Sequence, residues 1–203
     1  AFGVRYKAVK MKKAGNKLVL TVKYDYNKPD LSHMEEGEEK KAALKAWKEE
    51  KAYEVFDELP FWGNGQGYTN AKRNRYAIYD MGSGKLTYVA DEWTDCSQYS
   101  VLGNLLLYKA YPWKQSVMGI RPGVYLYNLS TGETKTLIAP DSMRTGVVSL
   151  LDEKTALIAA TDDSYKDTTK YCDFYHMDLA DGSMKLIHPY ESSIGGSSVG
   201  SDS

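Results

Sequence analysis

The sequence is poor in the residues that build disulfide frameworks and metal centres. Its 203 residues include only two cysteines, Cys96 and Cys172, which lie far apart and show no C-x-x-C spacing. Such a pair supplies neither the disulfide framework of a small secreted domain nor a zinc-ligand pattern. We therefore expect no metal and no cofactor, and the cysteine usage fits a reducing, cytoplasmic environment.

Long apolar runs and an excess of one charge are also missing. The sequence has no run of about 18 apolar residues, so no membrane-spanning helix is predicted. Residues 1–20 carry Lys and Arg throughout, so no signal peptide is predicted, although a chain that begins at Ala1 is expected to be processed or excised. The formal net charge of −1 gives no general attraction to nucleic acid or to an anionic membrane.

Catalytic patterns are nearly absent. The three histidines, His33, His176 and His188, show no metal-ligand spacing such as H-E-x-x-H. Residues 196–200 fit G-x-S-x-G around Ser198, but a nucleophile elbow needs a helix after the serine, followed by Asp and His. Only five residues follow Ser198 in this sequence. We therefore predict no catalytic residue within the chain.

Tyrosine is abundant, and a repeat runs through the sequence. Seventeen tyrosines and few helical patterns indicate β structure. Three segments, 75–90, 123–139 and 173–189, each read as an alternating strand, a tight turn and a second strand. They recur at steps of 48 and 50 residues. A period of about 40–50 residues made of β-hairpins is typical of a β-propeller blade.

Each of these hairpins is preceded by another, which completes a blade of four strands, here called a to d in chain order. The a–b turns fall at 15–16, 103–104 and 152–154. The predicted fold is therefore all-β, a partial β-propeller of about three four-stranded antiparallel blades plus the start of a fourth, with one helical insertion. The predicted boundaries are 4–90 for blade one with its insertion 27–73, 95–139 for blade two, 143–189 for blade three and 191–203 for the start of the next. Propellers usually close with four to eight blades, so we expect a fragment of a larger ring.

The b–c connections are the long ones. They span 27–73, 110–122 and 162–172, and antiparallel strand order brings them to one face. Function tends to lie on loops held by a rigid scaffold, so this face is the predicted working surface. Within the first connection, residues 34–56 are predicted to form a charged helix. The favoured interpretation is a solvent-exposed insertion that Trp47 packs against the blade, and the alternative is a helix that binds a partner.

The end of the insertion carries a more specific pattern. It reads ELPFWGNGQGYTN and leads through a basic run into a blade strand. This order resembles the N-terminal propeller of prolyl-oligopeptidase-type serine peptidases, in the acylaminoacyl-peptidase or dipeptidyl-peptidase-like branch. The matching residues are Leu59, Pro60, Phe61, Trp62, Gly65, Gly67, Tyr68, Asn70, Lys72, Arg73 and Arg75. The resemblance implies a propeller of roughly seven blades that caps a C-terminal α/β-hydrolase domain and limits access to small peptides.

The predicted function is a non-catalytic propeller part that gates and orients small peptide substrates for that separate hydrolase domain. Phe61, Trp62, Tyr68 and Arg73 are the predicted substrate contacts. Packing on blade one is the favoured interpretation of Phe61 and Trp62, with a cavity wall as the alternative. The basic cluster around Arg73 is expected to be solvated or ion-paired, because it is too small for a nucleic-acid footprint.

Two alternatives and one further partner remain open. A free-standing propeller that binds a protein or another ligand has no hydrolase domain, whereas a propeller enzyme would need paired carboxylates on the ring axis, and no spacing suggests them. The hydrolase domain and short peptides are the expected partners, with neither nucleic acid nor membrane. An excised arc would also expose an apolar face at each end, so the fragment is expected to self-associate.

Overall fold

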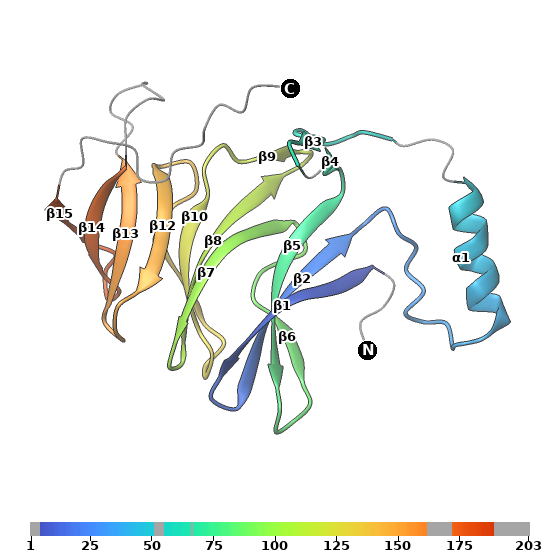
Figure 1. Cartoon of the computed structure of the whole chain (residues 1–203), viewed down its shortest axis with the longest axis horizontal. Helices are drawn as coiled ribbons and strands as arrows, with labels where there is room; N and C mark the ends of the chain where they lie inside the picture. Colours follow the sequence, from blue (N-terminus) through green and yellow to red (C-terminus); the bar gives the residue numbers. More distant parts are fainter. Residues whose placement is uncertain (1–4, 51–54, 66, 162–171, 189–203) are drawn as a thin grey trace. The chain divides into compact units, whose positions relative to one another are not determined.

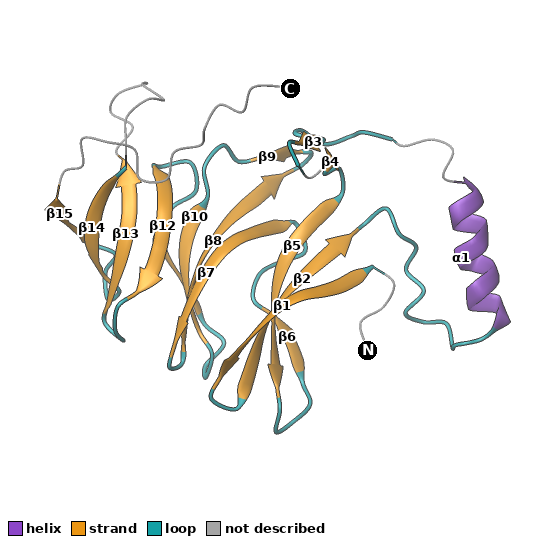
Figure 2. Cartoon of the chain, viewed as in Figure 1, coloured by secondary structure: helices purple, strands orange, loops and turns teal. Residues whose placement is uncertain are grey.

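The computed structural model describes most of the chain, namely residues 5–50, 55–65, 67–161 and 172–188. Antiparallel strands dominate these residues, and one helix accompanies them (Figures 1 and 2). The chain forms two compact units. The first comprises residues 1–97 and 111–119, and the second comprises 98–110 and 120–203. Among the described residues, no helix has the length and apolar character needed to cross a membrane.

The first unit is built on a four-stranded sheet in the order β1-β2-β5-β6. The strands are β1 (Tyr6–Ala14), β2 (Lys17–Asp25), β5 (Lys72–Asp80) and β6 (Leu86–Tyr88). Alternation along β2 places Leu20 and Val22 on one face, where they pack with Ala77 of β5. Strand β1 ends the sheet and exposes most of its side chains.

The second sheet follows the order β11-β10-β8-β7, and the third follows β12-β13-β14-β15. The second contains β7 (Thr94–Leu102), β8 (Leu105–Lys114), β10 (Gly123–Asn128) and β11 (Thr134–Ile138), with the two-residue β9 (Val117–Met118) paired to β8. The third contains β12 (Arg144–Leu150), β13 (Thr155–Thr161), β14 (Asp173–Asp178) and β15 (Met184–His188). Each of the three sheets has the predicted a-b-c-d order, so the prediction of three four-stranded antiparallel blades is confirmed.

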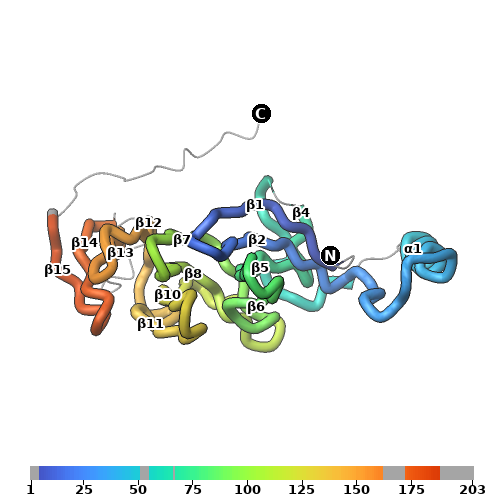
Figure 3. Tube along the Cα trace, turned by 90° about the horizontal axis from the view of Figure 1, so that it is seen from below, coloured from blue at the N-terminus to red at the C-terminus, as the bar shows by residue number. Residues whose placement is uncertain are grey.

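The second unit joins the second and third sheets through a shared core. Figure 3 shows the backbone of the strands that contribute to it. Leu107, Val124, Val148, Ile158 and Met177 are all at most 2% exposed within it. The burial of these aliphatic side chains is the main stabilising contribution to this unit, at roughly 2 kcal/mol for each fully buried side chain.

Two lysines of the second sheet also reach backbone carbonyls of the third. The Lys109 ammonium donates to the carbonyl oxygens of Thr145 and Gly146 at 3.1 and 2.5 Å. The Lys135 ammonium donates to the carbonyls of Leu179 and Ala180. The two blades of this unit are therefore held by polar contacts at their surface as well as by the core.

The c–d turns repeat one another closely. Each begins with Asp or Asn and has a glycine four residues later: Asp80 and Gly84, Asn128 and Gly132, Asp178 and Gly182. The three glycines have φ values of 70, 78 and 78°, a region that side chains disfavour. The first residue of each turn accepts a backbone N–H on its side-chain oxygen, from Gly82, Ser130 and Ala180 respectively. This local chemistry explains why the hairpins were visible in the sequence.

The helical insertion is shorter than predicted. Helix α1 spans Glu38–Glu50, whereas the sequence predicted 34–56. The first helical hydrogen bond runs from Lys41 N–H to the Gly37 carbonyl, so Gly37 stands at the N-cap and residues 34–37 remain outside. No residue of α1 is buried, but the Trp47 indole donates to the Asn27 carbonyl at 3.0 Å. The predicted fourth blade at 191–203, and Ser198 with it, lies outside the described residues.

Candidate functional site

A cleft of about 720 Å³ lies in the first unit, where the b–c connection of blade one leaves the sheet. The end of β2 and the beginning of β5 line it, together with residues of β1 and of the insertion. Parts of β7 and β8 that belong to the same unit complete the lining. The cleft therefore lies at the b–c end of blade one. We refer to this space as the blade-one cleft.

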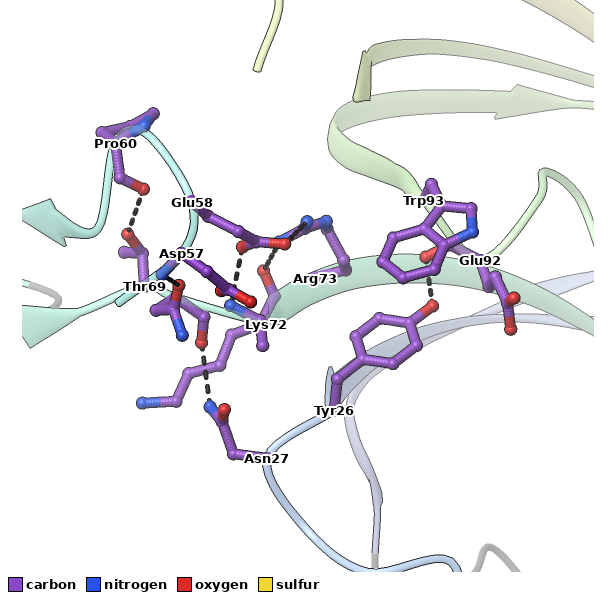
Figure 4. Close-up of polar contacts among 12 residues, drawn as sticks. Tyr26, Asn27, Asp57, Glu58, Pro60, Thr69, Lys72, Arg73, Glu92 and Trp93 are labelled. Carbon is purple, nitrogen blue, oxygen red and sulfur yellow. Dashed lines mark hydrogen bonds and ion pairs between the residues drawn. The ribbon is translucent and has the colours of Figure 1, made fainter. Parts of the chain in front are cut away.

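The insertion is fastened beside the cleft by a buried ion pair. Arg73 donates from Nη2 to Glu58 Oε1 at 2.6 Å and from Nη1 to Oε2 at 3.1 Å (Figure 4). The two side chains are 0% and 7% exposed. The guanidinium also lies 3.6 Å from the centre of the Trp113 ring. The planar guanidinium of arginine can make two parallel hydrogen bonds to one carboxylate. This contact fixes the beginning of β5 against the insertion.

A second network holds the loop that follows. The Asn70 amide donates to the Val55 carbonyl at 2.8 Å, and the Asn70 carbonyl accepts from the Asn27 amide at 2.9 Å. Thr69 donates from its N–H to the Phe61 carbonyl at 2.8 Å. Its hydroxyl donates to the Pro60 carbonyl at 3.2 Å (Figure 4). Most of the pattern ELPFWGNGQGYTN is thus explained by contacts that the segment makes with itself and with blade one.

The aromatic side chains of this segment form one cluster with different exposures. Strands β3 (Trp62–Gly63) and β4 (Gly67–Tyr68) pair as a short hairpin, which brings Trp62 and Tyr68 into edge contact at 5.0 Å. Both line the cleft, and they are 53% and 44% exposed. Phe61 instead contacts Phe56 at 5.1 Å and is not part of the lining. Both aromatic rings of the hairpin therefore line the cleft, whereas Phe61, which precedes it, does not.

The cleft is rich in positive charge. Six cationic side chains line it, from Arg5, Lys7, Lys23, Lys28, Lys72 and Arg73. Among the described residues of the lining, two carry carboxylates, Asp25 and Asp95. Burial raises the pKa of the Asp95 carboxyl, and its Oδ1 already accepts from the Asn74 N–H at 2.6 Å. No group of three or more metal-binding side chains occurs among the described residues.

An aromatic pair lies at the neighbouring end of β2. Tyr26 stacks on Trp93 with ring centres 5.0 Å apart and planes 4° from parallel. The Tyr26 hydroxyl donates to the Glu92 carbonyl, and burial raises the pKa of this hydroxyl (Figure 4). Neither residue is part of the cleft lining, so the pair supports the loop that leads from β2 into the insertion.

Three of the four residues predicted as substrate contacts line the cleft, namely Trp62, Tyr68 and Arg73. The fourth, Phe61, does not. Lysines of β1 and β2 and the indole of Trp113 were missed. No sequence motif marks them. The place of the lysines in the lining follows from the register of β1 and β2, and Trp113 lies 40 positions after Arg73 in the sequence.

Comparisons with protein-family models and with curated protein sequences find no match to this chain. Solved structures do match. The β-propeller domain of the Trilobed protease from Pyrococcus furiosus covers 96% of this chain at a TM-score of 0.51 and 8% identity. The chain has a β-propeller fold. The uncomplexed acylaminoacyl peptidase from Pyrococcus horikoshii covers 92% of this propeller at a TM-score of 0.54 and 13% identity.

The match covers only part of the length of each solved protein. This propeller spans 45% of the length of the Trilobed protease domain and 25% of the acylaminoacyl peptidase. The resemblance to peptidase propellers that the sequence suggested is therefore confirmed for the fold. At 8 and 13% identity it shows the fold alone.

Proposed function

We propose that this propeller is the non-catalytic part of a serine peptidase and that it gates and orients short peptides for a separate α/β-hydrolase domain. One observation carries the proposal. The exposed rings of Trp62 and Tyr68 lie in a cleft on the b–c face, on a hairpin anchored by a buried ion pair. The similarity to propeller domains of peptidases supports the same assignment.

Three of the four predicted contact residues have a role in this proposal. Trp62 and Tyr68 bind the peptide, because large exposed rings offer apolar contact at little cost in side-chain entropy. Arg73 positions them, because its guanidinium is held by Glu58 of the insertion. Phe61 packs on Phe56 outside the cleft lining and does not contact the peptide. A rigid hairpin of this kind lowers the entropic cost of binding.

Calorimetric titration of the intact chain with short peptides that contain phenylalanine tests this role. We expect Trp62→Ala to weaken binding about tenfold, with a change in unfolding free energy of roughly 0.5 kcal/mol or less, as for an exposed side chain. Phe61→Ala is the matched control, since it removes a neighbouring ring outside the lining. Equal binding by the Trp62→Ala variant and the parent chain would refute the proposal, and so would the absence of peptide binding.

A free-standing binding propeller is the second candidate, because every described residue of the cleft lining belongs to the first unit. The coding sequence next to this chain separates the two functions. A G-x-S-x-G between a strand and a helix, followed by Asp and His, supports the peptidase. The chain alone should not react with a fluorophosphonate probe, and specific labelling of Ser198 would overturn the non-catalytic assignment.

A further inference from the structure

Two lysines face each other across the first two strands of blade one. Lys7 of β1 is the direct register partner of Lys23 of β2, and Lys23 is in turn paired with Asn74 of β5. Both lysines are exposed and both line the blade-one cleft. Neither ammonium has a hydrogen bond or an ion pair to any described residue. Like charges directly opposite each other destabilise a sheet, so this pair has a cost that folding alone does not explain.

Protection of a sheet edge accounts for only part of this pattern. Strand β1 ends its sheet and carries further exposed lysines such as Lys10 and Lys13, which is a usual defence against pairing with another chain. Lys23 lies on β2, which is flanked by β1 and β5 and has no free edge. Edge protection therefore gives no reason for a lysine at position 23.

The carboxylates of the lining do not neutralise these two ammonium groups. The two carboxylates are already engaged: Asp95 accepts from Asn74, and Asp25 accepts from the Asn27 N–H at 3.2 Å and lies 3.9 Å from Lys28. A ligand that supplies acceptor oxygens and negative charge complements such a surface.

We propose that the blade-one cleft selects peptides that carry a carboxylate within a few residues of an aromatic or large apolar residue. The apolar residue lies on Trp62 and Tyr68, and the carboxylate lies between the ammonium groups of Lys7 and Lys23, where it offsets their mutual repulsion. The carboxylate is the C-terminus of the peptide or the side chain of Asp or Glu. This inference rests on the proposed peptide-binding function and adds the chemistry of the peptide.

Four matched peptides test the selection. The parent probe is Ala-Phe-Ala-Glu-Glu with a free C-terminus, and the others replace both glutamates by glutamine, amidate the C-terminus, or do both. Calorimetry with the intact chain should show the parent probe binding about tenfold more tightly than the fully neutral peptide. The advantage should shrink between about 20 and 150 mM salt, since exposed charges are screened. The two singly changed peptides report which carboxylate is bound.

A pair of double variants assigns the effect to the two lysines. Lys7→Gln with Lys23→Gln should weaken binding of the parent probe roughly fivefold and leave the neutral peptide unaffected, as expected for two partly exposed ion pairs. Lys10→Gln with Lys13→Gln makes the same charge change on exposed positions of β1 outside the cleft, and should change nothing. Circular dichroism establishes that both variants fold.

The outcomes separate this inference from the function on which it rests. If all four peptides bind equally and Trp62→Ala weakens them all, the carboxylate preference is refuted and peptide binding stands. If a folded chain binds no peptide, the proposed function itself is refuted. If the control variant with Lys10→Gln and Lys13→Gln weakens binding equally, the preference comes from net charge and not from the cleft, which also refutes the inference. Binding of a thymidine oligonucleotide or of anionic vesicles as tightly as the parent probe would show a general polyanion surface and would also overturn the inference.

Discussion

The carboxylate of Glu58 accepts hydrogen bonds from both terminal nitrogens of Arg73, fifteen residues further along the chain, in a site that solvent barely reaches. A third donor, the Ala71 N–H, reaches Glu58 Oε2 at 2.7 Å. The two arginine contacts join the insertion to the beginning of β5, and the third reaches the residue just before it. The pair therefore helps to fix the Trp62 hairpin relative to the sheet.

Removal of the acid should be costly. Glu58→Ala leaves the Arg73 guanidinium buried without a counter-charge, and we expect a loss of about 3 kcal/mol in unfolding free energy. Urea titration measures it. Glu35→Ala, at an exposed position ahead of the helix, is the matched control and should stay within roughly 0.5 kcal/mol of the parent. A small effect of Glu58→Ala would mean that water replaces the carboxylate. Combining Glu58→Leu with Arg73→Met should recover most of the loss.

The c–d turns predict a specific acid sensitivity. Backbone N–H groups of Ser83 and Gly82 hold the pKa of Asp80 below its ordinary value of 3.8. A carboxyl with a depressed folded pKa stabilises the protein above its unfolded pKa, and this contribution is lost as the pH falls below 3.8 through the folded pKa.

Asp80→Asn should therefore keep the turn, as Asn128 does in blade two, and flatten the fall in stability below pH 3.8. Asn128→Asp is the reciprocal variant and should steepen it. Unfolding by urea at several pH values measures both slopes. Parallel curves for the two variants would contradict this account of the turns.

The contact of Lys109 with β12 predicts a third effect. The ammonium satisfies the carbonyl of Gly146, which lies in an irregular part of the β12–β13 register, and burial lowers the pKa of this lysine. Lys109→Met should leave that carbonyl unpaired and cost about 1–3 kcal/mol. Lys114→Met, on the exposed end of the same strand, is the control. Equal urea midpoints for the two variants would show that the contact adds no stability.

Self-association is the fourth prediction. Strand β15 is the last strand of its sheet and carries Leu186 and Ile187 at 45% and 56% exposure. An apolar strand edge invites pairing with a second copy. We expect light scattering across a dilution series to show reversible dimers, weakened by Ile187→Lys but not by Ile120→Lys in an exposed loop. A monomer at every concentration would show that the described edge does not drive association.

The sequence predicted the blades because their signals are local. A turn that begins with Asp or Asn and needs a glycine at positive φ can be recognised without knowledge of the rest of the molecule. The ends of the helix were not predicted well, since α1 buries no side chain and so has no apolar stripe that marks its limits.

The cleft was predicted only in part. Trp62, Tyr68 and Arg73 belong to one continuous pattern, and that pattern identified them. The partner of Arg73 was not predicted, because many carboxylates precede it in the insertion and a solvated state was as much expected as an ion-paired one. The pairing of Lys7 with Lys23 follows from a register that includes a shift between Ala8 and Lys10, which no single strand reveals.

Only two positions of each c–d turn require a particular residue type, and this has a consequence for sequence divergence. Backbone geometry dictates two identities in each turn, the leading Asp or Asn and the glycine four residues later, while the intervening letters read MGS, LST and LAD. Elsewhere in a blade the strands require alternating apolar character more than particular residues. Nearly all residues of a blade can therefore be substituted while its fold is kept. Sequence signals between propellers fade long before the architecture does, as the 8% and 13% identities to solved propellers illustrate.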